Sequence, residues 1–194
     1  AIAGPDGYIY DPDGAVTDEK INYLLEMRAS GRDKVQDYAD KFGCEFHAGE
    51  KPWGLGADKV DIMMPCATQN DVNMDSAKKI AASGIKYYIE VANMPTTNDA
   101  LEFLKEQKHM VIAPSKAVNA CGVAVSALEM AQNAERLYWT AEEVDAKMHQ
   151  IMANIYHSSV AAAERYGLGY DLVAGANIVG FQRVADAMTA QGIF

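Results

Sequence analysis

The side chains in this sequence that could do chemistry gather in four short polar turns, each of which follows an apolar run. The turns read GPDG (residues 4–7), PCATQN (65–70), ANMPTT (92–97) and APSKAVN (113–119). If the apolar runs are parallel strands, their carboxyl ends lie at one edge of a sheet, where ligands of open α/β sheets bind. The side-chain amides and hydroxyls offer hydrogen bonds with few charges, which suits a dinucleotide better than a metal ion. The alternative is that the turns only cap helices.

The helix expected after the fourth turn has two different faces. One face mixes polar and apolar side chains at helical spacing: Asn119, Val123, Ser126, Met130 and Asn133. Beside it, alanines repeat with the same spacing one residue later, and such small side chains let another backbone come close: Ala120, Ala124, Ala127, Ala131 and Ala134. The mixed face predicts one wall of a ligand site, and the alternative is a half-exposed helix edge.

Strands and helices alternate through the middle of the chain and would position these turns. Apolar runs at residues 60–64, 86–91 and 110–112 each lead into a polar turn and then a helix. This alternation is typical of a parallel sheet. Residues 1–3 have the composition of a further strand end that runs into the first turn. The sequence therefore predicts an α/β fold.

Residues that start or end helices predict further elements in the first third of the chain. Thr17 can cap a helix whose first turn is acidic, and a second helix is expected from about residue 32 to residue 42, where Gly43 would end it. Residues 44–47 fit a short strand. Trp53, in a loop rich in turn formers, is expected to anchor packing rather than to bind a ligand.

The last third of the chain is predicted to be helical. Thr140 and Glu143 form a capping box that starts a long helix toward residues 166–167. A final amphipathic helix is expected at about 177–190.

Composition excludes several classes of protein. The chain has 194 residues, 49% of them hydrophobic, and a formal net charge of −10, which fits one globular domain and disfavours nucleic acid or an anionic membrane as partner. Three widely spaced cysteines (Cys44, Cys66 and Cys121) suggest neither a disulfide framework nor a zinc site. No apolar run reaches the roughly 18 residues of a membrane span, and no secretory signal is evident. A soluble, cytoplasmic protein without a metal is expected.

Four long strings in this order resemble one family. PCATQN, ANMPTT, PSKAVNACGVAVSALEMAQN and GANIVGFQRVADAM look like the nucleotide-binding domain of the hexameric bacterial glutamate dehydrogenases, and the similarity covers essentially the whole chain. The resemblance implies a Rossmann-type, mostly parallel sheet flanked by helices, with one strand reversed, in residues 1–134. Residues 135–194 would form helices that return toward the substrate domain, and the intact enzyme would be a homo-hexamer.

The resemblance implies NAD as the cofactor. Asp6 matches the acidic position that accepts hydrogen bonds from the adenosine ribose, where a 2′-phosphate would be repelled, so that NAD is preferred over NADP. The other matching cofactor positions are Pro5, which shapes the same turn, Ala67 and Thr68 in the turn that borders the cofactor, Asn93 near the nicotinamide ribose and carboxamide, and Asn119.

The same resemblance places the substrate on the helix after the fourth turn. Ser126 is expected to hydrogen-bond the side-chain carboxylate of glutamate, and Val123 is expected to form an apolar wall beside the glutamate methylenes. Lys116 matches a family lysine without a catalytic role, and Cys121 stands where glycine is usual, which bears on helix packing rather than on function.

Two parts of the family's site have no counterpart in the sequence. The glycine-rich turn after the first strand, which would carry the cofactor pyrophosphate, would precede Ala1, and no G-x-G-x-x-G occurs in the chain. The family's catalytic lysine and aspartate belong to the preceding substrate domain. The expectation is therefore a piece of the enzyme that lacks the first strand of the fold and any catalytic residue, and that is inactive alone.

The implied reaction converts L-glutamate, NAD and water to 2-oxoglutarate, ammonia and NADH. One alternative is a noncatalytic nucleotide-binding or assembly module. Another is a dehydrogenase for a different amino acid, such as leucine or phenylalanine, although the Ser126 hydroxyl suits a carboxylate better than an apolar group.

Overall fold

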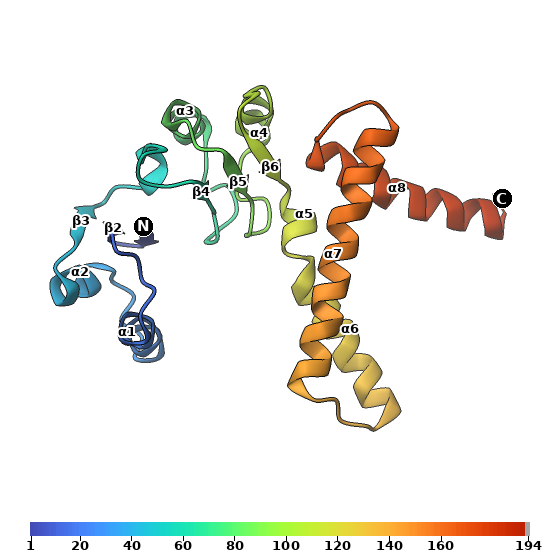
Figure 1. Cartoon of the computed structure of the whole chain (residues 1–194), viewed down its shortest axis with the longest axis horizontal. Helices are drawn as coiled ribbons and strands as arrows, with labels where there is room; N and C mark the ends of the chain where they lie inside the picture. The colour runs from blue at the N-terminus through green and yellow to red at the C-terminus, as the bar shows by residue number, and fades with distance from the viewer. Residues whose placement is uncertain (193–194) are drawn as a thin grey trace. The chain divides into compact units, whose positions relative to one another are not determined.

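The computed structural model describes residues 1–192 and divides into two compact units (Figure 1). The first unit holds Ala1–Asp61 and Lys78–Gly84, and the second holds Ile62–Ala77 and the chain from Ile85 onward. Composition predicted one domain, and no linker in the sequence marks the boundary at residue 61. The predicted boundary near residue 134 stays a prediction.

The sheet of the first unit is antiparallel, in the order β1 (Ile2–Gly4), β2 (Gly7–Tyr10) and β3 (Glu45–Ala48). Ile2 lies opposite Ile9, and Gly4 lies opposite Gly7. The strand predicted at the start of the chain is confirmed, but the prediction that its turn shares a parallel edge with the other three turns is wrong. The GPDG turn is short enough to fold β2 directly back onto β1 as a hairpin.

The first unit also contains two helices, α1 (Asp18–Ala29) and α2 (Gln36–Phe42), a short 3-10 turn at Pro52–Gly54, and the C-terminal part of α3 (Met74–Ser83). The Thr17 side chain accepts a hydrogen bond from Lys20 N, as a capping threonine should. Helix α2 begins four residues later than predicted and ends at Gly43 in the left-handed region, as predicted.

The core of the first unit lies between its sheet and its two helices. Trp53 is buried, which agrees with its predicted packing role. The buried cluster contains Ile9, Met27, Val35, Tyr38 and Ala39.

The sheet of the second unit is parallel, which confirms the α/β prediction. Its order is β4 (Ile62–Met63), β5 (Tyr87–Ile89) and β6 (Val111–Ala113), with Tyr88 of the central strand opposite Met63 and Ile112. Helix α3 (Met74–Ser83) follows β4, and α4 (Asn98–Lys105) follows β5. Tyr88 is fully buried. The absence of a first Rossmann strand stays a prediction.

Between Ser115 and residue 192 the structure has four helices: α5 (Ser115–Val118), α6 (Ala120–Glu135), α7 (Ala141–Arg165) and α8 (Leu172–Gln191). The predicted capping box starts α7, and α7 packs against α6 and α8 (Figure 1). Helix α8 begins five residues before the predicted 177, because the Asp171 side chain accepts a hydrogen bond from Ala174 N and caps it there. None of the helices within residues 1–192 is both long and apolar enough to cross a bilayer.

Candidate functional site at the carboxyl edge of the parallel sheet

Backbone hydrogen bonds join the turns that follow β4 and β5. Val91 N and Ala92 N both donate to Pro65 O, at 3.2 and 3.0 Å, and Asn70 N donates to Met94 O at 3.0 Å. Pro65 is fully buried. Because the bonds run from the start of each turn to its tip, the two turns form one connected surface at the strands' carboxyl ends.

A second set of bonds lies where these turns enter their helices. Val72 N donates to Pro95 O at 2.9 Å, and Thr97 N donates to Val72 O at 3.0 Å. Tyr88 OH lies 2.7 Å from Thr96 Oγ1, with both residues buried, and burial raises the pKa of the tyrosine hydroxyl. A buried and satisfied polar pair of this kind fixes the position of the turn above it.

Two residues in these turns adopt the left-handed backbone conformation although neither is glycine. Asn70 has φ 58° and Met94 has φ 48°. Such residues are uncommon and tend to cluster at binding sites. The Asn70–Met94 hydrogen bond joins the two left-handed residues directly, and Asn93 precedes one of them.

The third turn reaches the turn after β5 through Asn119, which lies between α5 and α6. Asn119 Nδ2 donates to Val91 O at 3.1 Å and to Asn93 Oδ1 at 2.7 Å. The structure thus brings two of the predicted cofactor residues into direct contact. Among residues 1–192, Asn93 Nδ2 and Asn119 Oδ1 make no hydrogen bond, so one donor group and one acceptor remain available at this point.

Helix α5 is held in place by two polar contacts. The Glu90 side chain is buried, and its Oε2 accepts a hydrogen bond from Ser115 N at 3.2 Å, at the helix N-terminus, where a carboxylate is favourable. Lys116 Nζ donates to Asn177 Oδ1 on α8. This role of Glu90 was not predicted from the sequence, because nothing there distinguishes a buried glutamate at a strand end from an exposed one. That Lys116 has no catalytic role stays a prediction.

Both predicted cofactor residues after β4 and both predicted substrate residues on α6 are open to solvent. Ala67 and Thr68 are exposed at the turn after β4, as a border to a bound ligand requires. On α6, Val123 is 72% exposed and Ser126 is also exposed. Ser126 Oγ donates to Gly122 O at 3.3 Å, which is long for a hydroxyl donor, so the hydroxyl can rotate toward a better acceptor.

The alanine stripe of α6 was predicted to pack against another backbone. It is only partly covered within the described chain, since Ala127 and Ala134 are exposed. The stripe therefore has room for further contacts.

Asp6 and Pro5 lie in the first unit, in the turn between β1 and β2. Pro5 is exposed. The Asp6 carboxylate accepts two hydrogen bonds of 3.1 Å, from Val35 N to Oδ1 and from Gln36 N to Oδ2. Each oxygen keeps a second lone pair, so the carboxylate can still accept from a sugar hydroxyl.

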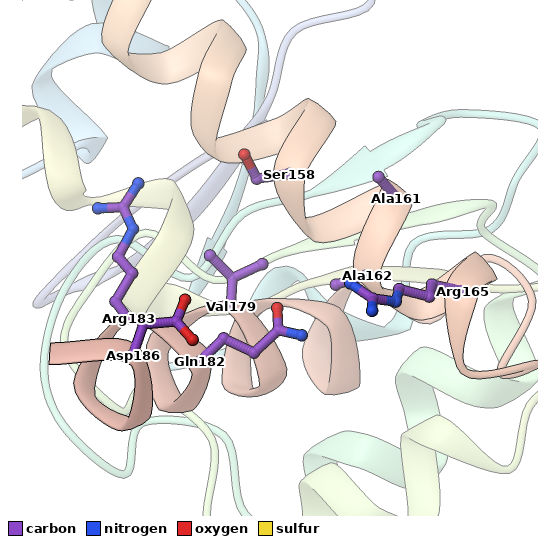
Figure 2. Close-up of a pocket in the computed structure, with 8 residues that line it drawn as sticks. All are labelled: Ser158, Ala161, Ala162, Arg165, Val179, Gln182, Arg183 and Asp186. Carbon is purple, nitrogen blue, oxygen red and sulfur yellow. The ribbon is translucent and has the colours of Figure 1, made fainter. Parts of the chain in front are cut away.

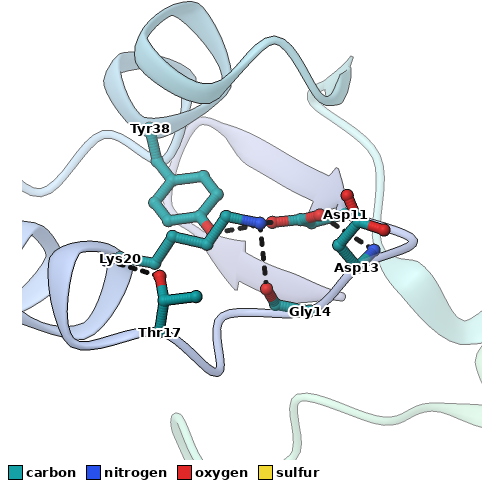
Figure 3. Close-up of polar contacts among 6 residues, drawn as sticks. All are labelled: Asp11, Asp13, Gly14, Thr17, Lys20 and Tyr38. Atoms are coloured by element: carbon teal, nitrogen blue, oxygen red, sulfur yellow. Dashed lines mark hydrogen bonds and ion pairs between the residues drawn. The ribbon is translucent and has the colours of Figure 1, made fainter.

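A polar cluster around Asp11, which follows β2, was not predicted from the sequence (Figure 3). Asp11 Oδ2 accepts hydrogen bonds from Lys20 Nζ and from Tyr38 OH, both at 2.7 Å, and the neighbouring ammonium and hydroxyl hold the pKa of Asp11 below its usual value. Burial and the same carboxylate raise the pKa of Tyr38. The only signal in the sequence was a lysine in the first turn of α1, where a cation is unfavourable unless a carboxylate compensates it.

A groove of about 290 Å³ lies between α7 and α8, away from all of the predicted residues (Figure 2). Its polar lining includes Arg165 from α7 and Gln182, Arg183 and Asp186 from α8. No group of three potential metal-ligating side chains occurs within residues 1–192.

A parallel sheet with polar turns joined at its carboxyl edge is the place where open α/β proteins bind their ligands. The chain matches the Glutamate/Leucine/Phenylalanine/Valine dehydrogenase family over residues 1–192, and it belongs to this family.

Individual relatives are close in sequence and in structure. The chain is 73% identical, over 192 residues and 99% of its length, to the NAD-specific glutamate dehydrogenase of Clostridium symbiosum. It is 50% identical, over 96% of its length, to the NADP-specific glutamate dehydrogenase of Escherichia coli. A solved glutamate dehydrogenase superposes on 98% of the chain with a TM-score of 0.92 and 74% identity.

The chain spans less than half the length of these relatives. It covers 42% of the Clostridium symbiosum enzyme, 40% of the Escherichia coli enzyme and 42% of the solved structure. The names of these proteins describe the longer polypeptides.

Proposed function

We propose that the chain is the nucleotide-binding domain of an NAD-dependent glutamate dehydrogenase, which interconverts L-glutamate, NAD and water with 2-oxoglutarate, ammonia and NADH. The observation that carries the proposal is the Asn93–Asn119 pair, held by Val91 O at the edge where the turns after β5 and β6 meet. The 73% identity to an NAD-specific glutamate dehydrogenase supports the choice of reaction.

The described residues fit the cofactor by their chemistry. The Asn93 amide group can donate and the Asn119 oxygen can accept, which is the pair of functions that a carboxamide needs. The Asp6 carboxylate has lone pairs for ribose hydroxyls. We assign the exposed Ala67, Thr68 and Pro5 to the borders of the same cofactor.

The chemistry that NAD supplies when bound is acceptance of a hydride from the glutamate Cα. The chain's own task is to hold the nicotinamide carboxamide and the adenosine ribose in a fixed orientation.

For the substrate, we assign Ser126 as a hydrogen-bond donor to the distal carboxylate of glutamate and Val123 as an apolar wall for its methylenes. Both side chains are exposed on α6, one helical turn apart on the face that begins at Asn119. A carboxylate is a stronger acceptor than the Gly122 carbonyl, so the Ser126 hydroxyl would exchange its long bond for this one.

Another amino acid is the second candidate substrate, because the family description also names leucine, phenylalanine and valine dehydrogenases. The Ser126 hydroxyl favours glutamate, since an apolar substrate would give it no new partner.

The assembly and location of the intact enzyme belong to the same proposal. The resemblance supports a homo-hexamer in the cytoplasm, with the helices of residues 135–194 returning toward the substrate domain. The catalytic groups would lie in that domain.

The test compares NAD with NADP in the full-length enzyme, before and after Asp6→Asn. The wild type should prefer NAD in kcat/KM, and Asp6→Asn, which removes the charge but keeps the size, should lower the NAD-to-NADP ratio about tenfold or more. An enzyme that prefers NADP, or a ratio that Asp6→Asn leaves unchanged, would remove the role assigned to Asp6.

A further inference from the structure

The orientation of the Asp6 carboxylate depends on the start of α2. Val35 N and Gln36 N, which hold it, lie 29 and 30 residues further along the chain. A Cβ on Gly4 would come within 2.9 Å of Asp6 Oδ1 and 3.0 Å of Val35 Cγ1, so glycine is what allows this close approach. The carboxylate is therefore positioned by a helix that is distant in sequence.

Helix α2 needs help to keep its own position. It has only seven residues, and Val35 at its N-cap offers no capping side chain. Helices this short are marginal without tertiary contacts. Tyr38, in the first turn, is fully buried, and its ring lies 4.7 Å from that of Phe42.

The Tyr38 hydroxyl ties α2 back to the strand that follows the Asp6 turn (Figure 3). It donates to Asp11 Oδ2, which also accepts from Lys20 Nζ, and Asp11 Oδ1 accepts from Asp13 N at 3.1 Å. Asp11 directly follows β2, and β2 pairs with β1 across the Asp6 turn. The contacts thus form a closed ring from Asp6 through β2, Asp11, Tyr38 and α2 back to Asp6.

We propose that Tyr38 is a positioning residue for cofactor discrimination: its hydrogen bond to Asp11 holds the start of α2, and thereby holds Asp6 where it favours NAD over NADP. This inference rests on the proposed role of Asp6. Repulsion between a carboxylate and a 2′-phosphate falls with distance, so a displaced or mobile Asp6 discriminates less well.

The experiment measures kcat/KM with NAD and with NADP in the full-length enzyme for four variants. Tyr38→Phe removes one hydroxyl and keeps the ring. Tyr170→Phe is the matched control, because it also removes one hydrogen-bonded hydroxyl, which lies 2.8 Å from Tyr156 OH, but both tyrosines belong to the second unit and neither holds α2. The other two are Asp6→Asn and the double variant Asp6→Asn/Tyr38→Phe.

Tyr38→Phe should lower the NAD-to-NADP ratio about threefold to tenfold, as expected for one hydrogen bond, with kcat at saturating NAD nearly unchanged. Tyr170→Phe should leave the ratio unchanged. In the Asp6→Asn background, Tyr38→Phe should have no further effect on the ratio, because the residue through which it acts is already altered.

Each other outcome overturns the inference in a distinguishable way. If Asp6→Asn changes the ratio and Tyr38→Phe does not, the positioning role fails while the function of Asp6 stands. If Tyr38→Phe lowers the ratio equally in both backgrounds, Tyr38 acts independently of Asp6. If Asp6→Asn has no effect, the proposed function of Asp6 fails, and the inference fails with it.

Discussion

Ser126 is a residue whose proposed role rests on one hydroxyl. Within the described chain, the only hydrogen bond of this hydroxyl is the 3.3 Å bond to Gly122 O, which lies in the same helix, α6. Ser126→Ala should raise the KM for glutamate about tenfold and change kcat much less, because a hydrogen bond to a charged group is worth about 1.5–3 kcal/mol. The measurement is steady-state kinetics of the full-length enzyme at saturating NAD.

Asn133→Ala is the control for this prediction, since Asn133 lies on the same face of α6, two turns further along, and is exposed. It should leave the KM for glutamate unchanged. A Ser126→Ala enzyme with the wild-type KM would contradict the assignment.

Contacts between residues could be predicted from the sequence only where the topology implied them. Asn93 and Asn119 follow neighbouring parallel strands, and the prediction that their turns meet is confirmed by the 2.7 Å contact between them. The hydrogen-bond partners of Asp6 could not be predicted, because they are backbone amides about 30 residues further along the chain and no side-chain pattern marks them. Whether these residues bind NAD stays a prediction.

At the scale of elements, the helices were easier to predict than the strands. Capping residues located the starts of α1 and α7, where the Thr17 and Thr140 side chains accept hydrogen bonds from the first turn. The strands have only two to four residues, too few to show a period. The single helix predicted after β6 is instead two, α5 and α6, which meet at Asn119 with φ −93° and ψ 7°.

The packing of α7 against α8 depends on Gly175. A Cβ at this position would lie 2.0 Å from Ser159 O and 3.3 Å from Ala163 Cβ, both on α7. Gly175→Ala should therefore force the two helices apart and lower the free energy of unfolding by about 1–3 kcal/mol. Urea titration followed by circular dichroism measures this difference.

Gly180 provides the matched control on the same helix, because nothing lies within 4 Å of a Cβ there. Gly180→Ala should raise the free energy of unfolding by up to about 1 kcal/mol, the difference in helix propensity between the two residues. Equal effects of the two substitutions would show that the close approach at Gly175 does not limit the packing.

At the scale of the whole molecule, the two compact units each contain one tryptophan. Trp53 is buried in the first unit, and Trp139 lies in the second, with Lys147 Nζ 4.9 Å from the centre of its ring. Trp139→Phe therefore leaves a fluorescent reporter of the first unit alone, and Trp53→Phe leaves a reporter of the second. Composition did not predict this division, because no linker-like stretch marks the boundary at residue 61.

Acid should weaken the first unit through Asp11, whose side chain is only 9% exposed. Its pKa in the folded chain is below the ordinary value of 3.8, so the ionised form stabilises the fold above about pH 4, and this contribution is lost as the pH falls further. The test uses denaturant titrations at pH 7 and pH 3 in the Trp139→Phe background. Asp11→Asn should lower the free energy of unfolding at pH 7. It should also make the difference in free energy of unfolding between pH 7 and pH 3 smaller than it is with Asp11.

The second reporter provides the control for this prediction. In the Trp53→Phe background, Asp11→Asn should leave the transition reported by Trp139 unchanged, because the hydrogen-bond partners of Asp11 all lie in the first unit. An equal loss of stability at pH 3 with and without the Asp11 carboxylate would show that other acidic groups, rather than this cluster, set the acid sensitivity of the unit that carries Asp6.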